Sequence, residues 1–231
     1  MSFEDTVTRQ YAGAEGKAYH QGKRGIPAGA YPWIARLRAE KIAPSISPDA
    51  DVFEYGVGAG WNLASLTCTT KAGYDICKDL APTVEEHGID FVHDPKQLAD
   101  NSFDAVICHH VLEHVPNPVE SIEEMIRLLR PGGKLLVFVP FEKERRYRRY
   151  DPAEPNRHLY SWNVQTLSNL LAKTQLKVQS ASVGRFGYDR FAAVTAARLH
   201  LGEFGFRLIR GLVHLVKPAL EVRVTAVKDT A

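Results

Sequence analysis

Cysteine is scarce in this chain of 231 residues, and its placement argues against both disulfides and zinc. Cys68, Cys77 and Cys108 are scattered, their number is odd, and no CxxC pair is present. Few, unpaired cysteines are typical of proteins in a reducing compartment. The sequence therefore argues against a disulfide framework and against a cysteine-rich zinc site.

Long apolar runs and an excess of charge of one sign are also missing. No run of about 18 uninterrupted apolar residues is present, so no membrane-spanning helix is predicted. Residues 1–10 are polar and lack the apolar core of a signal peptide. The formal net charge of +2 gives no whole-chain argument for a polyanionic partner such as nucleic acid. We therefore expect a cytoplasmic globular protein, either a monomer or a homodimer.

The centre of the chain alternates between strand and helix patterns. Strands are predicted at 52–55, 72–76, 90–93, 103–108 and 135–139, and helices at 62–66, 80–86 and 118–129. The last of these helices is expected to stop at Arg130-Pro131-Gly132-Gly133. This alternation predicts an α/β fold, with a parallel sheet and helices on both faces. Ligands of such sheets bind beyond the carboxyl ends of the strands, so the residues that follow each strand are the candidates for a site.

The flanking regions carry different patterns. Helices are predicted at 33–42 and at 161–173, with Ser161 as the N-cap of the second, and strands at 177–183 and 221–227. Helical patterns fill most of the region between those two strands. We interpret 1–231 as a single domain with an N-terminal helical lid at 1–50, a ligand-binding core at 51–184, a helical insertion at 185–219 and a final strand at 220–231.

A glycine turn follows the first predicted strand. Gly56, Gly58 and Gly60 stand where that strand ends, and Glu54 precedes the first of them by two residues. Glycine permits a positive φ and a close approach of the backbone to a ligand. The spacing is GxGxG, whereas a dinucleotide-binding turn reads GxGxxG and seats a pyrophosphate. The turn therefore favours a nucleoside ligand with no phosphate at this point over a nicotinamide dinucleotide.

Acidic residues end or follow the next two predicted strands. Asp75 lies about 20 residues after the first glycine, where an acid that binds a ribose is expected. Asp94 follows the third strand, where its carboxylate could accept a hydrogen bond from an adenine amino group. Each residue also has a purely structural interpretation: Asp75 could cap a helix, and Asp94 could form a turn with Pro95.

Three segments in order resemble the class I S-adenosylmethionine-dependent methyltransferases. Segment 52–60 is similar to their motif I, 103–115 to their fourth-strand motif, and 126–135 to the LLRPGG segment that leads to their fifth strand. The similarity is strongest to the small-molecule subgroup that includes ubiquinone biosynthesis O-methyltransferases. The resemblance implies a Rossmann-like sheet of seven strands whose last strand is antiparallel. It also implies S-adenosyl-L-methionine as cofactor and S-adenosyl-L-homocysteine as product.

The resemblance also implies roles for the matching positions. Glu54 would face the methionine amino group across the turn formed by Gly56, Gly58 and Gly60, Asp75 the ribose, Asp94 the adenine, and Cys108 and His109 the methionine portion. The paired histidines at 109 and 110 depart from the family pattern, which often has small, polar or acidic residues there. This departure leaves the substrate and any acid–base role open.

Methyl transfer from a sulfonium is an in-line displacement, and a hydroxyl acceptor must also lose a proton. A positioned general base adds about 10²–10⁴-fold to the rate, and histidine suits the task because its unperturbed pKa is about 6.5. The candidates are His109 and His110 after the fourth strand, His114 nearby, and His158 after the fifth. For each of them a packed or capping role is the alternative.

The segment 110–114 could instead form a metal site. His110, Glu113 and His114 stand at i, i+3 and i+4, so on a helix they would share a face, and HxxEH is an inverted zinc-protease signature. An acid-acid-histidine set in the resembling ubiquinone enzymes is associated with a divalent ion. The family motif accounts for Glu113 and His114 without a metal, however, and no distal ligand is apparent. We therefore assign no metal.

The acceptor is predicted only by class. Basic residues crowd the segment 143–149, which favours an anionic acceptor, although solvated loop charge explains it equally well. A candidate helix at 202–218 is rich in apolar residues and carries Arg207, Arg210, His214 and Lys217, which suits a lipidic acceptor or a membrane surface; a cover over the site or a dimer contact is the commoner explanation. The Asn-Pro-Pro-Tyr type of motif found in base-methylating enzymes is absent, so we expect a small-molecule acceptor and no nucleic acid. The alternative function is a non-catalytic module that binds S-adenosylmethionine or a nucleoside.

Overall fold

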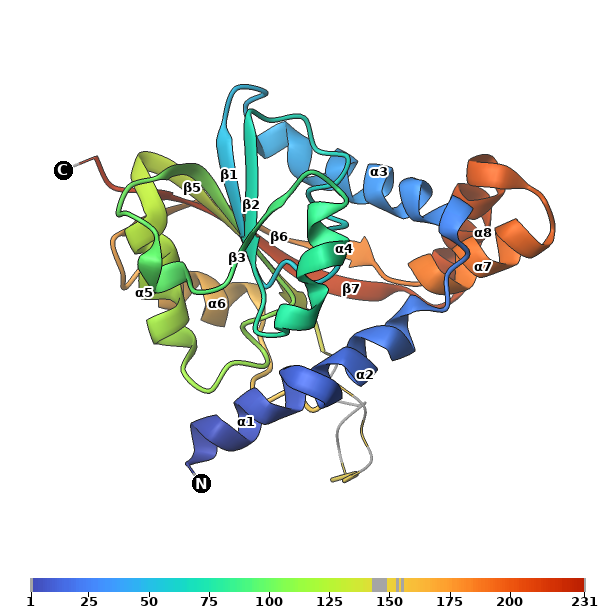
Figure 1. Ribbon diagram of the computed structural model, residues 1–231, viewed down its shortest axis with the longest axis horizontal. Coiled ribbons are helices and arrows are strands. Elements are labelled where there is room, and N and C mark those ends of the chain that lie inside the picture. Colours follow the sequence, from blue (N-terminus) through green and yellow to red (C-terminus); the bar gives the residue numbers. More distant parts are fainter. Residues whose placement is uncertain (1, 143–148, 153, 155, 231) are drawn as a thin grey trace.

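A computed structural model describes residues 2–142, 149–152, 154 and 156–230 (Figure 1). Its sheet has seven strands in the order β3-β2-β1-β4-β5-β7-β6. The strands are β1 (Asp51–Tyr55), β2 (Thr70–Tyr74), β3 (Asp90–Val92), β4 (Phe103–His109), β5 (Leu129–Pro140), β6 (Leu176–Phe186) and β7 (Ala219–Lys228). Strands β1 to β5 pair in parallel, and β7 pairs antiparallel with both β5 and β6. The predicted α/β fold with an antiparallel last strand is confirmed.

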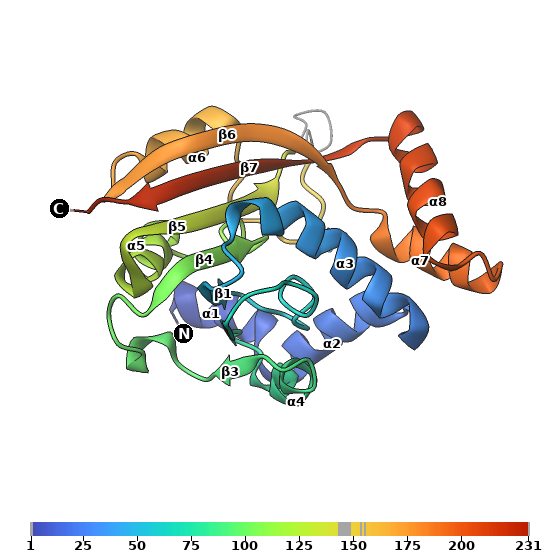
Figure 2. The ribbon, with the colours of Figure 1, turned by 90° about the horizontal axis from the view of Figure 1, so that it is seen from above.

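Helices cover both faces of the sheet (Figure 2). The α-helices on these faces are α3 (Tyr31–Ile42), α4 (Ala81–Glu85), α5 (Pro118–Leu128) and α6 (Val164–Leu171). Short 3₁₀ turns lie at Ala28–Ala30, Ala43–Ser45, Lys78–Leu80 and Pro95–Gln97. Alternate residues of β1, β4 and β5 enter two separate cores, because successive side chains of a strand point to opposite faces. In β4, Val106 packs with α5 and α6, whereas Ile107 packs with α3 and α4. His109 continues the row of Ile107, so its side chain emerges on the α3 face.

The N-terminal helices α1 (Phe3–Tyr11) and α2 (Gly13–Arg24) run along the lower edge of the molecule in Figure 1. Ser2 begins α1 through a capping box: its hydroxyl accepts from the Asp5 N–H, and the Asp5 carboxylate accepts from the Ser2 N–H. No residue of α1 is fully buried. The helix therefore lies against the body of the protein without entering its core.

The helices α7 (Asp189–Arg198) and α8 (Gly202–Val216) lie beyond the end of the β6–β7 pair (Figure 2). They pack on the N-terminal half of α3 through a third core that contains Ile34, Ala193 and Phe206. Ion pairs extend this contact, because Arg207 binds Glu40 at 2.7 Å. The insertion is therefore anchored to α3.

One face of α8 keeps apolar side chains in solvent: Phe204, Leu208, Leu212, Leu215 and Val216. Of the four cationic positions expected to accompany a membrane-facing surface, three make contacts within the protein. Arg207 pairs with Glu40 and Glu203, Arg210 pairs with Asp189 at 2.8 Å, and His214 is buried with Nε2 3.0 Å from the Phe186 carbonyl. No helix in the described part of the chain is long and apolar enough to cross a membrane.

Two local predictions are wrong. The segment 62–66 forms turns instead of a helix, in which the Gly60 carbonyl accepts from the N–H groups of Leu63 and Ala64. The N-cap of α6 is Asn163, whose side chain accepts from Thr166, and not Ser161. The predicted stop at 130–133 is confirmed, because α5 ends at Leu128, and the stop segment itself lies within β5.

Ile107 tests how far the sheet depends on its central strand. Its side chain is fully buried in β4, between β1 and β5. We expect Ile107→Ala to lower the free energy of unfolding by about 2–5 kcal/mol, through lost burial and a residual cavity. Urea unfolding would measure the change, with Val119→Ala on the exposed side of α5 as control, where a change within about 0.5 kcal/mol is expected. A similar small change for both variants would contradict the described core.

Candidate active site

The glycine turn that follows β1 contains three residues with positive φ angles. Gly56, Gly58 and Gly60 have φ values of 82°, 54° and 80°. The N–H groups of Gly56 and Val57 both donate to the Tyr74 carbonyl at 2.8 Å, which ties the turn to the end of β2. A Cβ on Gly56 would stand 2.2 Å from Val111 Cγ2. The turn therefore requires glycine for its backbone conformation and, at Gly56, for space.

A cavity of about 310 Å³ opens beside this turn. Its wall combines α1, α3, the turn and the ends of β2 and β4, and includes Val7, Thr8, Tyr11, Arg38, Asn62 and Val111. Of the predicted site residues, the wall contains Gly56, Gly58, Asp75, His109 and His110. Glu54, Gly60, Asp94, Cys108 and His158 are not among the residues that line it. The structure thus places the carboxyl ends of β1, β2 and β4 around one space, as the sheet topology predicts.

Asp75 stands at the end of β2 and faces two ways. One carboxylate oxygen accepts from the Gly58 N–H at 2.9 Å, and the other accepts from the Cys77 N–H at 2.9 Å. The side chain is 6% exposed and forms part of the cavity wall. A carboxylate has about four lone-pair sites, so both oxygens retain acceptor capacity toward a ligand.

Glu54 lies beneath the cavity wall and not on it. Its carboxyl group is fully buried, and Oε1 accepts a hydrogen bond from the Asn62 side chain, which does reach the cavity. No described residue donates to Oε2. Burial raises the pKa of Glu54 to about 8, against the opposing hydrogen bond from Asn62. The group is therefore mostly protonated at neutral pH in the free protein, and once ionised it has one oxygen available to a donor.

Asp94 and Cys108 each have a structural role in the fold. The Asp94 carboxylate accepts from the Lys96 N–H at 3.0 Å and caps the turn Pro95–Gln97. Cys108 is fully buried among apolar side chains, and burial raises the pKa of its thiol. Their roles in ligand binding stay predictions.

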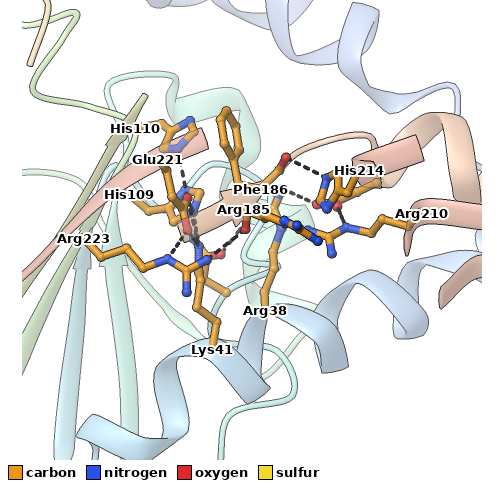
Figure 3. Close-up of polar contacts among 12 residues, drawn as sticks. Arg38, Lys41, His109, His110, Arg185, Phe186, Arg210, His214, Glu221 and Arg223 are labelled. Carbon is orange, nitrogen blue, oxygen red and sulfur yellow. Dashed lines mark hydrogen bonds and ion pairs between the residues drawn. The ribbon is translucent and has the colours of Figure 1, made fainter. Parts of the chain in front are cut away.

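His109 and His110 stack in parallel at the end of β4, with ring centroids 4.3 Å apart. Figure 3 shows them meeting Glu221 at the start of β7 and Lys41 from α3. Lys41 Nζ lies 2.8 Å from His109 Nε2 and 3.0 Å from Glu221 Oε1, and His110 Nε2 lies 3.4 Å from Glu221 Oε2. His110 has a positive φ of 57°, which turns the chain so that both rings face β7.

Burial and charge set the protonation of this cluster. Burial lowers the pKa of Lys41 to about 8 and that of His110 to about 4, and burial together with Lys41 holds the pKa of His109 well below its usual value. Burial alone would raise the pKa of Glu221, but its hydrogen bond with His110 and the charge of Lys41 outweigh this and lower it to about 2. At neutral pH both histidines are neutral, Glu221 is ionised, and Lys41 carries its counter-charge.

A second histidine group consists of His114 and His158. His158 Nδ1 is 2.6 Å from Glu142 Oε1, and the His158 ring packs edge-on against His114 at 4.7 Å between centroids. His114 lines the cavity, and its Nδ1 is 2.8 Å from the Tyr11 hydroxyl. The carboxylate beside Nδ1 leaves Nε2 of His158 as the acceptor nitrogen in the neutral tautomer.

The set His110, Glu113 and His114 does not assemble in the way that helical spacing would allow. Residues 112–114 form turns, and His110 points to Glu221 whereas His114 points to His158. The described residues instead offer two three-ligand groups whose ligand atoms lie within 4.8 Å of one another: His109, His110 and Glu221, and Glu113, His114 and His158. His110, Glu113 and His114 therefore do not share one helical face.

Sequence reasoning missed Lys41, Glu221, Asn62 and Arg38. An acid before an alternating segment was visible at Glu221, but its meeting with His110 depends on β7 inserting between β5 and β6. Lys41 lies in a helical pattern that marks it only as a surface position. The basic segment 143–149 lies outside the described residues except for Arg149, so its proximity to the cavity stays a prediction.

The comparisons with known proteins agree on the type of domain. A family profile described as a methyltransferase domain matches residues 30–181. A ubiquinone biosynthesis O-methyltransferase of Xanthomonas oryzae is 35% identical over 101 residues, which is 38% of this chain and 42% of the relative. A probable tRNA methyltransferase 9B of Mus musculus is 29% identical over 145 residues, which is 59% of this chain and 31% of the relative. The chain thus spans less than half the length of these curated relatives.

Solved structures share the fold at low sequence identity. The phosphoethanolamine N-methyltransferase 2 of Haemonchus contortus, in complex with S-adenosyl-L-methionine, superposes with a TM-score of 0.61 and 17% identity. The alignment covers all of this chain and 60% of that chain. At this identity the likeness supports the fold alone.

Gly56 tests the requirement for a glycine turn. Gly56→Ala would force a side chain into a positive φ and against Val111, so we expect a loss of about 1–3 kcal/mol in the free energy of unfolding. Chemical denaturation would measure it. Gly29→Ala is the matched control, because Gly29 has open space around its Cβ position and no positive φ. If both variants unfold alike, the conformation given to the turn is incorrect.

Proposed function

Because the chain belongs to the methyltransferase-domain family, which uses S-adenosyl-L-methionine, we propose that it transfers the methyl group of that cofactor to a small-molecule acceptor. The cavity beside the glycine turn carries the proposal. It brings Gly56, Gly58 and Asp75 together with the end of β4, where a methyl acceptor would enter. The transfer is an in-line displacement, so the cofactor's sulfur and the acceptor atom must lie on opposite sides of the methyl group.

The residues around the cavity suit this cofactor. Glu54 Oε2 is a buried oxygen to which no described residue donates, and an ammonium group is a donor that would satisfy it. Asp75 presents a carboxylate on the wall, which suits ribose hydroxyls. The turn at Gly56 and Gly58 lets the backbone approach a ligand closely. Asp94 as the adenine partner and Cys108 beside the methionine portion are parts of the proposal that rest on the family resemblance.

The cofactor brings an activated methyl group, and the chain has to orient the acceptor and exclude water. Orientation of two reactants can contribute about 7–11 kcal/mol to lowering the barrier. Val7, Thr8 and Tyr11 of α1 form part of the cavity wall, so α1 serves as a lid that separates the reaction from solvent. The interaction between Tyr11 and His114 would hold the lid in place.

A histidine base would remove the proton from an oxygen or nitrogen acceptor. His109 and His110 have the right position on the cavity wall, but burial keeps their pKa values low, and the Lys41 ammonium faces the acceptor nitrogen of His109. His158 has the arrangement of a carboxylate-oriented base, with Glu142 at Nδ1. We therefore favour His158 as the base and assign positioning roles to His109 and His110.

The mouse relative named as a tRNA methyltransferase keeps nucleic acid as an alternative acceptor. Two features favour a small molecule. The cavity lies under α1, and the formal net charge of the chain is only +2. A lipidic acceptor has weaker support, since the cations of α8 are paired within the protein. Calorimetric titration with S-adenosylhomocysteine and with NAD tests which class of cofactor binds. Turnover of a labelled methyl group then distinguishes an enzyme from the alternative, a non-catalytic binding module.

Glu54 makes cofactor binding depend on pH. Its pKa is about 8 in the free protein, and a nearby ammonium group would favour the ionised form, so binding below this pH releases a proton. We expect the affinity for S-adenosylhomocysteine to rise by up to about tenfold per unit between about pH 6 and about pH 8. Calorimetry in buffers of different ionisation enthalpy would count the protons. Glu54→Gln should remove the proton release and the pH dependence, and proton release unchanged in this variant would refute the assignment.

His158 should affect turnover and not cofactor affinity. We expect His158→Asn to lower kcat by about 10²–10⁴-fold, because the proton then has no oriented acceptor. Binding of S-adenosylhomocysteine should change by less than about twofold, since His158 does not line the cavity. His87→Asn is a control, because His87 follows α4, is exposed and does not line the cavity. Retained kcat in His158→Asn would assign the base elsewhere.

A further inference from the structure

A second cavity, of about 120 Å³, lies next to the first. It is lined by residues of α3, the end of β6, the start of β7 and the helices α7 and α8, and it is partly open to solvent. Arg38 and His109 line both cavities, so the two spaces share a wall. One water molecule needs roughly 10–15 Å³ of such space. The second cavity, of about 120 Å³, therefore admits a group several times larger than a water molecule.

The second cavity is lined mainly by cations. Arg38, Lys41, Arg185, Arg210 and Arg223 line it, and among the described residues the carboxylates on its wall are those of Asp189 and Glu221. Five cationic side chains therefore face two anionic ones. His109 adds no charge, because its pKa is held well below neutrality.

The two carboxylates are each shared between cations. Glu221 accepts from Lys41 at 3.0 Å and from Arg223 at 2.8 Å (Figure 3). Asp189 pairs with Arg210 at 2.8 Å and more distantly with Arg38 at 3.6 Å. Among the described residues no ion pair is recorded for the guanidinium of Arg185. Guanidinium groups thus retain unused donors around the cavity.

Three of these cations are largely buried: the side chains of Arg38, Lys41 and Arg210 are 24%, 14% and 18% exposed. Arg223 is 32% exposed, and Arg185 lies exposed at the rim of the cavity. Placing like charges together at this level of burial is unfavourable unless an anion balances them. Phe186 closes one side, with its ring 4.7 Å from that of His110. The cavity therefore has the charge and the fork-shaped donors that suit an oxyanion.

We propose that the second cavity binds an oxyanion, a carboxylate or a phosphate, carried by the methyl acceptor. This inference rests on the proposed function, since the first cavity is where the methyl group would be transferred. The anionic group would lie on the β7 side of His109, and the reacting atom on the glycine-turn side. His109 and Arg38 then act as the shared wall that fixes the distance between the two ends of the acceptor.

The same arrangement accounts for specificity. A neutral analogue would leave the guanidinium groups without the anion that balances them, and buried polar groups left unpaired select strongly against a ligand that lacks the partner group. The enzyme should therefore reject uncharged analogues of its acceptor.

The test uses the full chain with S-adenosylhomocysteine bound, titrated with inorganic phosphate and separately with acetate near pH 7, where Lys41 is charged. We expect saturable binding of at least one of these anions, and the tighter one identifies the group. Arg185→Gln should weaken it by about tenfold or more. Arg198→Gln, on the exposed end of α7 and outside the cavity, should leave the affinity unchanged.

Three outcomes would overturn the inference: no saturable binding of either anion, equal affinity in wild type and Arg185→Gln, or equal weakening by Arg198→Gln. A second variant, Arg210→Gln, guards against redundancy among the cations, with its folding checked by circular dichroism. Binding of S-adenosylhomocysteine is measured first in the same samples. Its loss would refute the proposed function, whereas its presence without anion binding refutes only the second cavity.

Discussion

The carboxylate of Glu221 joins the helical layer of this protein to the ligand-binding edge of its sheet. It lies fully buried at the start of β7 and contacts Lys41 of α3, His110 beyond β4, and Arg223 of its own strand. Removing one partner of a buried ion pair leaves an uncompensated charge, which costs about 3–5 kcal/mol. The position of α3 against the sheet, and of the two histidines at the end of β4, thus depends on one ionised group.

That interaction also separates two environments on either side of His109. Lys41 and Glu221 satisfy each other on the α3 face, and burial keeps the histidines neutral between them. Toward the glycine turn the cavity is lined by backbone, Asp75 and aromatic residues of α1 and β2, which suits a nucleoside. Toward β7 the wall is cationic. A neutral pair of rings is a suitable partition, because a charged one would repel the sulfonium of the cofactor.

The sequence predicts the central sheet well because its signals are local. Each of the segments ending at Tyr55, Tyr74 and His109 is a short buried strand followed by turn residues, and a parallel sheet necessarily gathers their ends. The segment 62–66 forms turns where the sequence predicts a helix, because Asn62 and Leu66 have helical spacing but the chain soon enters β2. Periodicity alone does not reveal how many residues the next strand requires.

The rest of the site could not be predicted, because it is assembled from residues that are distant in the chain. Glu221 follows His110 by 111 positions, and Lys41 precedes Glu221 by 180. Their contact depends on β7 entering between β5 and β6, and on α7 and α8 packing against α3. The family motifs define the cofactor half of the site, which is common to enzymes that act on many different acceptors. In the proposed function, the acceptor half would be built by α1, the insertion and the last strand. The residues that would decide the substrate are then those with the weakest signal in the sequence.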